Sequence, residues 1–227
     1  MNKKFFNIID YGSSKIRFAC FDKNQNITFS NSIEVYTNNN FQNKFEAVNE
    51  IIKKAEKKFS YHIEDIILIL DTVEIFIIDI SLTKNLGRSS KINKLYESLI
   101  LEINQITQSY YGDYYLSQII MDRCIVDNEQ IFEEFPKDKT ITNNIKVDFK
   151  LICFPKMFIQ KIRDGFIKNN LNITNIFCSS YAKSQSYVKK LSKNKIFFLD
   201  IGLRRSSIIL FENKKFKFIE TIPIGGL

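Results

Sequence analysis

Two short segments near the ends of the chain carry the residue types that bind phosphate. The first reads Asp10-Tyr11-Gly12-Ser13-Ser14-Lys15, and the second begins Asp200-Ile201-Gly202. In both, an aspartate ends an apolar strand, a glycine follows shortly after, and a second apolar strand returns beyond the turn. A single Asp-x-Gly hairpin is common among β-proteins. A matched pair in one chain indicates an internal duplication.

The chemistry of these hairpins suits a chain of phosphates. Glycine lets the backbone turn tightly and approach a ligand closely. The backbone N–H groups and serine hydroxyls of such a turn can donate hydrogen bonds to phosphate oxygens. An aspartate at the end of the strand can hold the water shell of a Mg²⁺ ion that bridges phosphates. Two facing hairpins would therefore clamp the phosphate tail of a nucleotide.

The elements that must position the first hairpin read as an α/β unit. Apolar runs predict a meander of three strands over 5–11, 15–22 and 27–36. Large apolar residues then recur at helical spacing from Phe41 to Phe59. Two further strands are predicted, a fully apolar one at 65–70 and another at 74–82. This βββαβ order is typical of a sheet with helices packed on it.

The middle of the chain reads as a small α+β module over 83–154. It contains a predicted helix at 91–105 and strands at 114–126 and 146–154, around a polar stretch. Beyond it, we expect a helix at 155–169, a strand at 173–177 and a helix at 179–191 with Ser179 or Ser180 as its cap. Three more strands close the chain, at 195–201, 206–211 and 216–222.

The composition excludes several classes of protein. With 44% hydrophobic residues in 227, the chain can bury a core and is not disordered. Its four cysteines form no C-x-x-C pair, which indicates neither a zinc site nor a disulfide framework. Asp10 interrupts the apolar start before it reaches the length of a signal peptide. We therefore expect a soluble, cytoplasmic protein.

The net charge of +8 raises the question of nucleic-acid binding. The excess is lysine dispersed along the chain, and no arginine-rich stripe alternates with aromatic residues. Solvated surface charge is the favoured interpretation, and no nucleic-acid partner is expected. The single histidine, His62, has no cysteine or carboxylate at ligand spacing and no serine or cysteine nucleophile to activate. No catalytic residue is assigned.

These motifs resemble the actin-like ATPase superfamily, whose fold is related to ribonuclease H, and within it the bacterial cell-division family FtsA. Residues 10–16 resemble the first phosphate motif of that family. Residues 198–211 and the turn Ile222-Pro223-Ile224-Gly225-Gly226 are similar to its second phosphate hairpin. Residues 83–154 fall where FtsA carries its inserted 1C, or SHS2-type, domain. The resemblance implies a subdomain 1A from 1–82 plus 155–180 and the start of a subdomain 2A over 181–227.

The same resemblance implies ATP and Mg²⁺ as cofactors. Asp10 would hold the water shell of Mg²⁺, and Lys15 would neutralise the phosphates. The remaining binding positions belong to the two turns: Gly12, Ser13, Ser14, Asp200, Gly202, Arg204, Arg205 and Ser206. Arg204 and Arg205 depart from the family, because a glycine and a threonine stand there in its usual motif. Their side chains would either bind phosphate directly or block the site. We therefore expect the protein to bind ATP rather than to hydrolyse it efficiently.

An FtsA-like role implies several partners. Such a protein binds ATP, assembles into filaments, recruits FtsZ and later division proteins, and reaches the cytoplasmic face of the inner membrane at the division site through a C-terminal helix. This chain ends before any such helix and reads as a fragment of a longer protein. Two alternatives stay open. One is a pilus-assembly scaffold like PilM, and the other is a sugar-kinase-like enzyme of the same superfamily.

Overall fold

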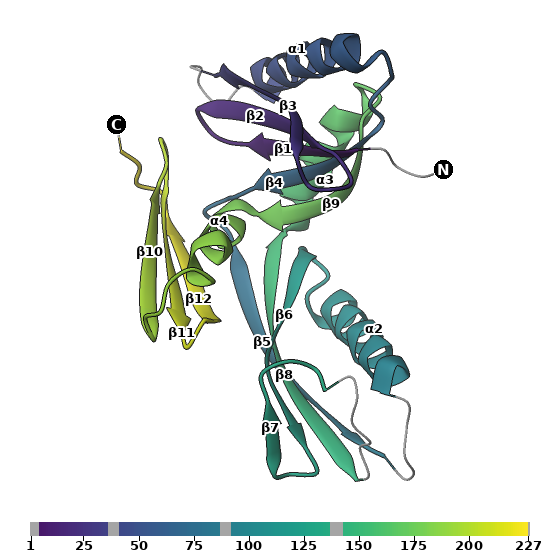
Figure 1. Ribbon diagram of the computed structural model, residues 1–227, viewed down its shortest axis with the longest axis vertical. Coiled ribbons are helices and arrows are strands. Elements are labelled where there is room, and N and C mark those ends of the chain that lie inside the picture. Colours follow the sequence, from purple (N-terminus) through teal and green to yellow (C-terminus); the bar gives the residue numbers. More distant parts are fainter. Residues whose placement is uncertain (1–4, 36–40, 87–91, 137–142, 227) are drawn as a thin grey trace.

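The computed structural model describes residues 5–35, 41–86, 92–136 and 143–226. Three β-sheets and four helices form the described part of the chain (Figure 1). The first sheet and its helices α1 and α3 are called the first lobe below. The second sheet with helix α2 is called the inserted unit, and the third is called the C-terminal sheet.

The first lobe is built on a five-stranded sheet in the order β3-β2-β1-β4-β9. Strands β1 and β2 form an antiparallel hairpin that β3 extends, whereas β4 and β9 run parallel to β1. The bounds of these strands are Phe6–Tyr11, Lys15–Phe21, Ile27–Glu34, Asp65–Leu70 and Asn172–Cys178. The carboxyl ends of β1 and β4 therefore meet at one edge of the sheet, where the first predicted turn lies.

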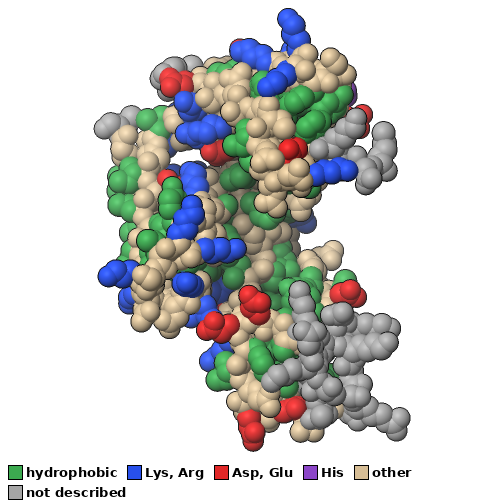
Figure 2. Space-filling model, viewed as in Figure 1, with side chains coloured by type: hydrophobic (Ala, Val, Ile, Leu, Met, Phe, Trp, Pro, Cys, Tyr) green, Lys and Arg blue, Asp and Glu red, His purple; other side chains and the backbone are tan. Residues whose placement is uncertain are grey.

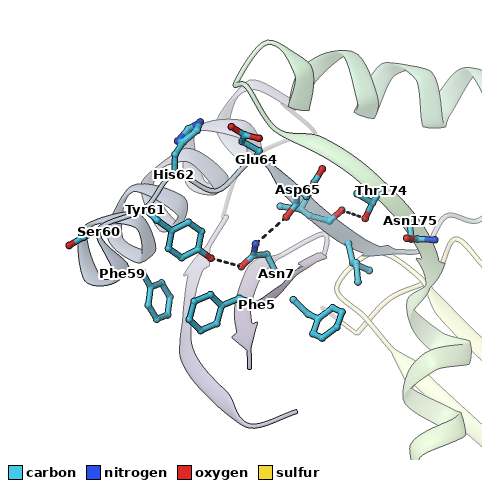
Figure 3. Close-up of a pocket in the computed structure, with 13 residues that line it drawn as sticks. Phe5, Asn7, Phe59, Ser60, Tyr61, His62, Glu64, Asp65, Thr174 and Asn175 are labelled. Carbon is cyan, nitrogen blue, oxygen red and sulfur yellow. Dashed lines mark hydrogen bonds between the residues drawn. The ribbon is translucent and has the colours of Figure 1, made fainter. Parts of the chain in front are cut away.

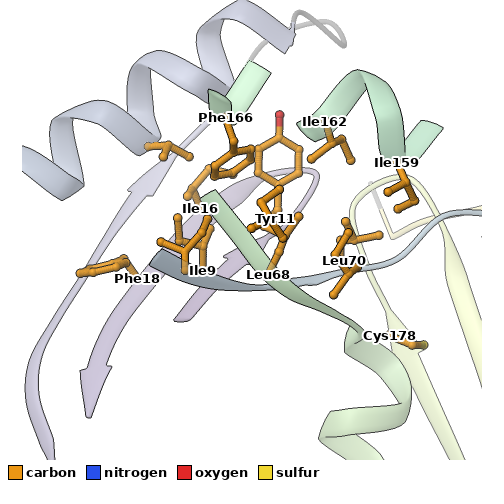
Figure 4. Packing of buried hydrophobic residues seen from close by; sticks show 14 of the residues in the cluster. Ile9, Tyr11, Ile16, Phe18, Leu68, Leu70, Ile159, Ile162, Phe166 and Cys178 are labelled. Carbon is orange, nitrogen blue, oxygen red and sulfur yellow. The ribbon is translucent and has the colours of Figure 1, made fainter. Parts of the chain in front are cut away.

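Helices α1 (Phe41–Phe59) and α3 (Lys156–Ile167) pack together over Tyr11. The ring of Phe45 on α1 lies 5.4 Å from that of Phe166 on α3, and Figure 4 shows Phe166 against Tyr11. Alternation along β1 points Ile9 and Tyr11 into this core and leaves Asp10 on the other face. The predicted amphipathic face of α1 is confirmed at its buried positions, Phe45, Val48, Ile52 and Ala55.

The inserted unit leaves the first lobe after β4 and returns at α3. Its antiparallel sheet has the order β5-β8-β6-β7, with α2 packed against it. The bounds are Phe76–Asn85 for β5, Ile92–Tyr110 for α2, Tyr114–Val126 for β6, Gln130–Phe132 for β7 and Asn144–Pro155 for β8. The boundary predicted at residue 83 falls inside β5. This strand pairs with β8 along its whole length, so the sheet begins at Phe76.

The C-terminal sheet is an antiparallel meander of β10 (Lys195–Ile201), β11 (Ser206–Glu212) and β12 (Lys215–Ile222). Helix α4 (Ser179–Val188) joins β9 to it and covers one face, where the ring of Tyr181 lies 5.1 Å from that of Phe216. Buried residues of this face, such as Phe211, belong to the same core as the first lobe. The opposite face of the sheet is exposed.

Most predicted elements are confirmed within a few residues, and three details differ. Helix α2 runs to Tyr110, well beyond the predicted end at Gln105, and the predicted start at Lys91 lies outside the described residues. Helix α4 ends at Val188. Its cap position is Cys178, without a side-chain cap bond, so neither predicted serine caps the helix, and the Ser180 hydroxyl donates to Asp71 instead. None of the helices in the described ranges has the length and apolarity that crossing a bilayer requires.

Candidate functional site

The first predicted turn is a tight, well-supported hairpin between β1 and β2. Asp10 pairs with Arg17 and Tyr11 with Ile16 across the two strands. A Cβ atom at Gly12 would lie 2.6 Å from the carbonyl oxygen of Lys15, so only glycine fits there. The backbone N–H of Val35 donates to the carbonyl of Ser14 at 2.7 Å and fixes the turn to the end of β3.

The second predicted turn, between β10 and β11, is closed by its own backbone and by the last residues of the chain. The N–H of Gly202 donates to the carbonyl of Arg205 at 2.8 Å, and the N–H of Gly226 donates to that of Gly202 at 3.0 Å. A Cβ atom at Gly225 would lie 2.1 Å from the carbonyl oxygen of Leu203. The Ser206 hydroxyl donates to the carbonyl of Ile224 at 2.7 Å. The sequence Ile-Gly-Gly is thus part of this turn.

Arg205 does not extend toward a free space but reaches back to the first lobe. Its guanidinium donates to the backbone carbonyl of Asp71 at 2.6 Å and lies 3.3 Å from the Asp71 carboxylate. Asp71 follows β4, and its side chain is only 1% exposed. A buried carboxylate needs such a partner because burial of an unpaired charge is costly. Arg205 is therefore engaged in holding the second hairpin to the carboxyl edge of the first sheet.

The same network extends through the start of α4 to Asp200. The backbone N–H of Ser180 donates to Asp71 at 3.0 Å. The Ser180 hydroxyl lies 2.6 Å from the Asp71 carboxylate and 3.1 Å from that of Asp200. Lys183, one turn further along α4, donates to Asp200 at 3.2 Å. Burial, followed by the charge of Asp71, raises the pKa of the neighbouring Cys178 thiol. No role for Asp71 or Lys183 could be inferred from the sequence, which predicted Ser180 only as one of two candidate helix caps.

The other predicted charges lie around the first turn. The Asp10 carboxylate accepts from the Arg17 guanidinium at 2.9 Å, on the face of the sheet opposite α1 and α3. Lys15 lies 3.9 Å from Glu34. Ser13 and Ser14 form the tip of the turn, and both are partly exposed.

A lysine that sequence reasoning missed lies beside the first turn. Lys44, near the start of α1, places its ammonium group 4.9 Å from the ring centre of Tyr11. Burial lowers the pKa of Lys44 to about 8, and the charges of Arg204 and Arg205 add to this effect. The charges of the second turn thus act on the pKa of a lysine that lies beside the first turn. The one available signal was its position just before Phe45 on the apolar face of the helix.

The charged side chains around the two turns are largely engaged with one another. Arg205 is paired with Asp71, and Lys44 lies over the ring of Tyr11. In Figure 2, Lys and Arg side chains border a gap between the C-terminal sheet and the first lobe. Asp10 and Asp200 both have cationic partners. Among the described residues, no three His, Cys, Asp or Glu side chains gather as a metal site requires. The predicted role of Asp10 toward Mg²⁺ stays a prediction, because one aspartate acting through water needs no such cluster.

A cavity of about 850 Å³ lies at the other end of the sheet, near the starts of β1, β4 and β9 (Figure 3). Its wall carries the stacked rings of Phe5 and Tyr61. Asn7 uses its amide inside the protein, donating to the backbone of Asp65 at 3.1 Å and accepting from Cys20. The cavity is thus lined mainly by aromatic and internally bonded groups, and we do not assign the function to it.

Comparison with known proteins identifies the fold and leaves the family open. No family model matches the sequence, and no curated protein matches it. Among solved structures, a PilM–PilN type IV pilus biogenesis complex matches 97% of this chain and 62% of that chain, with a TM-score of 0.60 and 10% identity. The present chain therefore spans less than two thirds of that protein.

Two weaker matches have the same TM-score of 0.47 and 9% identity. One is a Bacteroides thetaiotaomicron protein with an actin-like ATPase fold, of which the chain covers 72%. The other is the ethanolamine utilization protein EutJ from Carboxydothermus hydrogenoformans, of which it covers 54%. The strand order of the first lobe and the two turns define the class: this chain has the actin-like ATPase fold.

Proposed function

We propose that this chain is the nucleotide-binding part of an actin-fold scaffold that works by assembly rather than by turnover. The observation that carries the proposal is that Arg205 holds the second glycine turn to the carboxyl end of β4, the end of the sheet at which the first glycine turn also lies. The β1–β2 turn contributes backbone and serine donors, and Lys44 and the β10–β11 turn contribute positive charge. A phosphate tail of three or four negative charges is the natural ligand of two such turns.

The engaged carboxylates support slow turnover. Hydrolysis needs a group that orients or deprotonates the attacking water. Asp10 is paired with Arg17, Asp71 with Arg205, and Asp200 with Lys183. A carboxylate whose oxygens already accept bonds from a cation is poorly placed to orient a water molecule. We therefore propose that nucleotide binding, and not its cleavage, is the useful event.

Within this class, we favour a cell-division role of the FtsA kind. The inserted unit leaves after β4 and returns at α3, which is the position that the resemblance predicts for the 1C domain. The turn formed by residues 222–226 also resembles that family. The parent protein would then self-assemble, bind FtsZ and other division proteins, and act at the cytoplasmic face of the inner membrane.

A pilus-assembly role is the second candidate, because the PilM–PilN complex matches nearly the whole chain. The two roles differ in their partners. An FtsA-like protein binds the C-terminal tail of FtsZ, whereas the matched protein is part of a complex with PilN. Binding of labelled peptides from FtsZ and from a PilN of the same organism, measured by fluorescence anisotropy, distinguishes them.

The test of the nucleotide proposal is direct. A fluorescent ATP analogue should bind measurably at equilibrium. Light scattering gives the rate of assembly, and single-turnover hydrolysis of ATP should be slower than that rate. Ser13→Glu places a negative charge in the first turn and should weaken binding about tenfold or more. Ser192→Glu, in the exposed loop before β10, is the matched control and should not. Equal affinity in both variants, or no binding by the wild type, would refute the proposal.

A further inference from the structure

The cavity at the amino-terminal edge of the first sheet is separate from the two turns. It lies where β1, β4 and β9 begin, whereas the first turn follows the carboxyl end of β1 and the second is held to that of β4. Strand β1 has six residues, so its two ends lie on the order of 15–20 Å apart. The cavity therefore needs an explanation of its own.

Three aromatic rings form one wall of this cavity. The ring of Phe5 is stacked on that of Tyr61, with 5.6 Å between the ring centres and 6° between the planes. Its centre lies 5.0 Å from that of Phe59, and the rings of Phe59 and Tyr61 are 5.8 Å apart. All three residues are half-buried. In Figure 3 their rings lie together on one side of the cavity, with Thr174 and Asn175 on the other.

This wall is held in place by the turn that follows α1. Ser60 has a φ of 55°, in the left-handed region that usually takes glycine, and its N–H donates to the carbonyl of Glu56 at 2.7 Å. The Glu56 carboxylate accepts from the N–H of Ile63 at 2.8 Å and lies 2.5 Å from His62. Tyr61 lies between these fixed points, so the protein sets its position before any ligand arrives. A pre-formed site loses little conformational entropy on binding.

The polar groups of the cavity are already bonded within the protein. The Asn7 amide donates to the carbonyl of Asp65 at 3.1 Å, and its oxygen accepts from the Tyr61 hydroxyl at 3.5 Å. The Thr174 hydroxyl donates to the carbonyl of Ile66 at 3.0 Å. A ligand would therefore gain affinity mainly from burying apolar surface and from contact with the rings.

We propose that this cavity binds a small planar aromatic molecule, which stacks on the wall formed by Phe5, Phe59 and Tyr61. The volume of about 850 Å³ is in the range of small-molecule sites. Stacked rings bind a further flat ring by more than the area that it buries. The inference is independent of the proposed function, because no residue of the two turns lines the cavity.

Fluorescence titration with N-phenyl-1-naphthylamine, an uncharged probe that brightens when it leaves water, tests the site. The wild type should bind the probe saturably. Asn175→Trp adds a bulky side chain at an exposed position that lines the cavity, and it should weaken binding about tenfold or more. Thr83→Trp, at an exposed position of β5, is the matched control and should bind as the wild type does. Thermal unfolding verifies that both variants fold.

The probe must also be distinguished from one that binds the exposed C-terminal sheet. Leu199 is 62% exposed on that sheet, so Leu199→Lys would weaken binding there and should leave binding at the cavity unchanged. Probe binding that ignores Asn175→Trp, that falls equally in the two tryptophan variants, or that is lost in Leu199→Lys would overturn the proposed site. Absence of saturable binding by the folded wild type would overturn it as well.

Competition against the probe tests the class of ligand. 2-Naphthol and decahydro-2-naphthol share one carbon skeleton, but only the first is flat and aromatic. 2-Naphthol should displace the probe at a concentration at least about threefold lower, and Tyr61→Leu should reduce this preference, because leucine keeps the apolar contact and loses the ring. Equal competition by the two compounds, or a preference that Tyr61→Leu leaves intact, would overturn the aromatic class of ligand.

Discussion

Asp71 and Arg205 lie 134 residues apart in the chain, yet they form the contact that fixes the second turn to the first lobe. We predict that Arg205→Met lowers the free energy of unfolding by about 3–5 kcal/mol, because Asp71 stays buried without its cation. Lys193→Met, at an exposed position, is the control and should change the free energy of unfolding by less than about 0.5 kcal/mol. Urea unfolding followed by circular dichroism measures both.

A double-mutant cycle separates the pair from general damage to the turn. Asp71→Asn combined with Arg205→Met removes both charges and keeps an oxygen that can accept from Ser180. The double variant should lose less stability than the sum of the two single variants. Additive losses would mean that the two residues are not coupled.

The four cysteines give a prediction about reactivity. All four are buried, and burial raises the pKa of Cys20 and Cys153 to about 12 and that of Cys124 to about 11. Because the thiolate is the reactive form, we expect a thiol reagent such as DTNB to leave all four unmodified in the native protein at pH 8. All four should react in denaturant. Fast labelling of the native protein would contradict the packing described here.

Among the elements, the contact between α1 and α3 depends on a glycine. A Cβ atom at Gly165 would lie 2.0 Å from the ring of Phe45, so the two helices approach as closely as they do only because that atom is missing. We predict that Gly165→Ala destabilises the first lobe by about 1–3 kcal/mol, despite the better helix propensity of alanine. Lys161→Ala, on the exposed side of α3, is the control and should be nearly neutral.

The first lobe shows which features of the structure can be predicted from the sequence. The two turns and most strands were predictable because they follow from local signals, such as the alternation along β1 and the glycine at position 12. The assignment of β5 to the inserted unit depends on its pairing with β8, and no local pattern marks that choice. The same holds for Lys44, which reads as one more dispersed lysine until the fold places it over the ring of Tyr11.

At the scale of the whole molecule, the outer face of the C-terminal sheet carries an aligned set of exposed apolar side chains. Cross-strand register places Phe197, Leu199 and Ile201 of β10 on the same face as Ile208 of β11 and Phe218 and Ile222 of β12. Phe197, Leu199 and Ile201 are each about 60% exposed. In the described sheet, β10 is also an edge strand. A flat apolar face beside an open edge favours association between chains.

We therefore predict that this chain self-associates at micromolar concentration, and that its mean sedimentation coefficient rises with concentration. Leu199→Lys places a charge in the middle of the edge strand, which should shift the equilibrium toward monomer without loss of thermal stability, because the position is solvent-exposed. Ile131→Lys is the matched control, since it adds the same charge at an exposed isoleucine of the inserted unit. Sedimentation velocity of the three proteins over a hundredfold range of concentration decides the matter. A wild type that stays monomeric throughout, or a control that dissociates the chains as well as Leu199→Lys does, would show that this face does not drive the association.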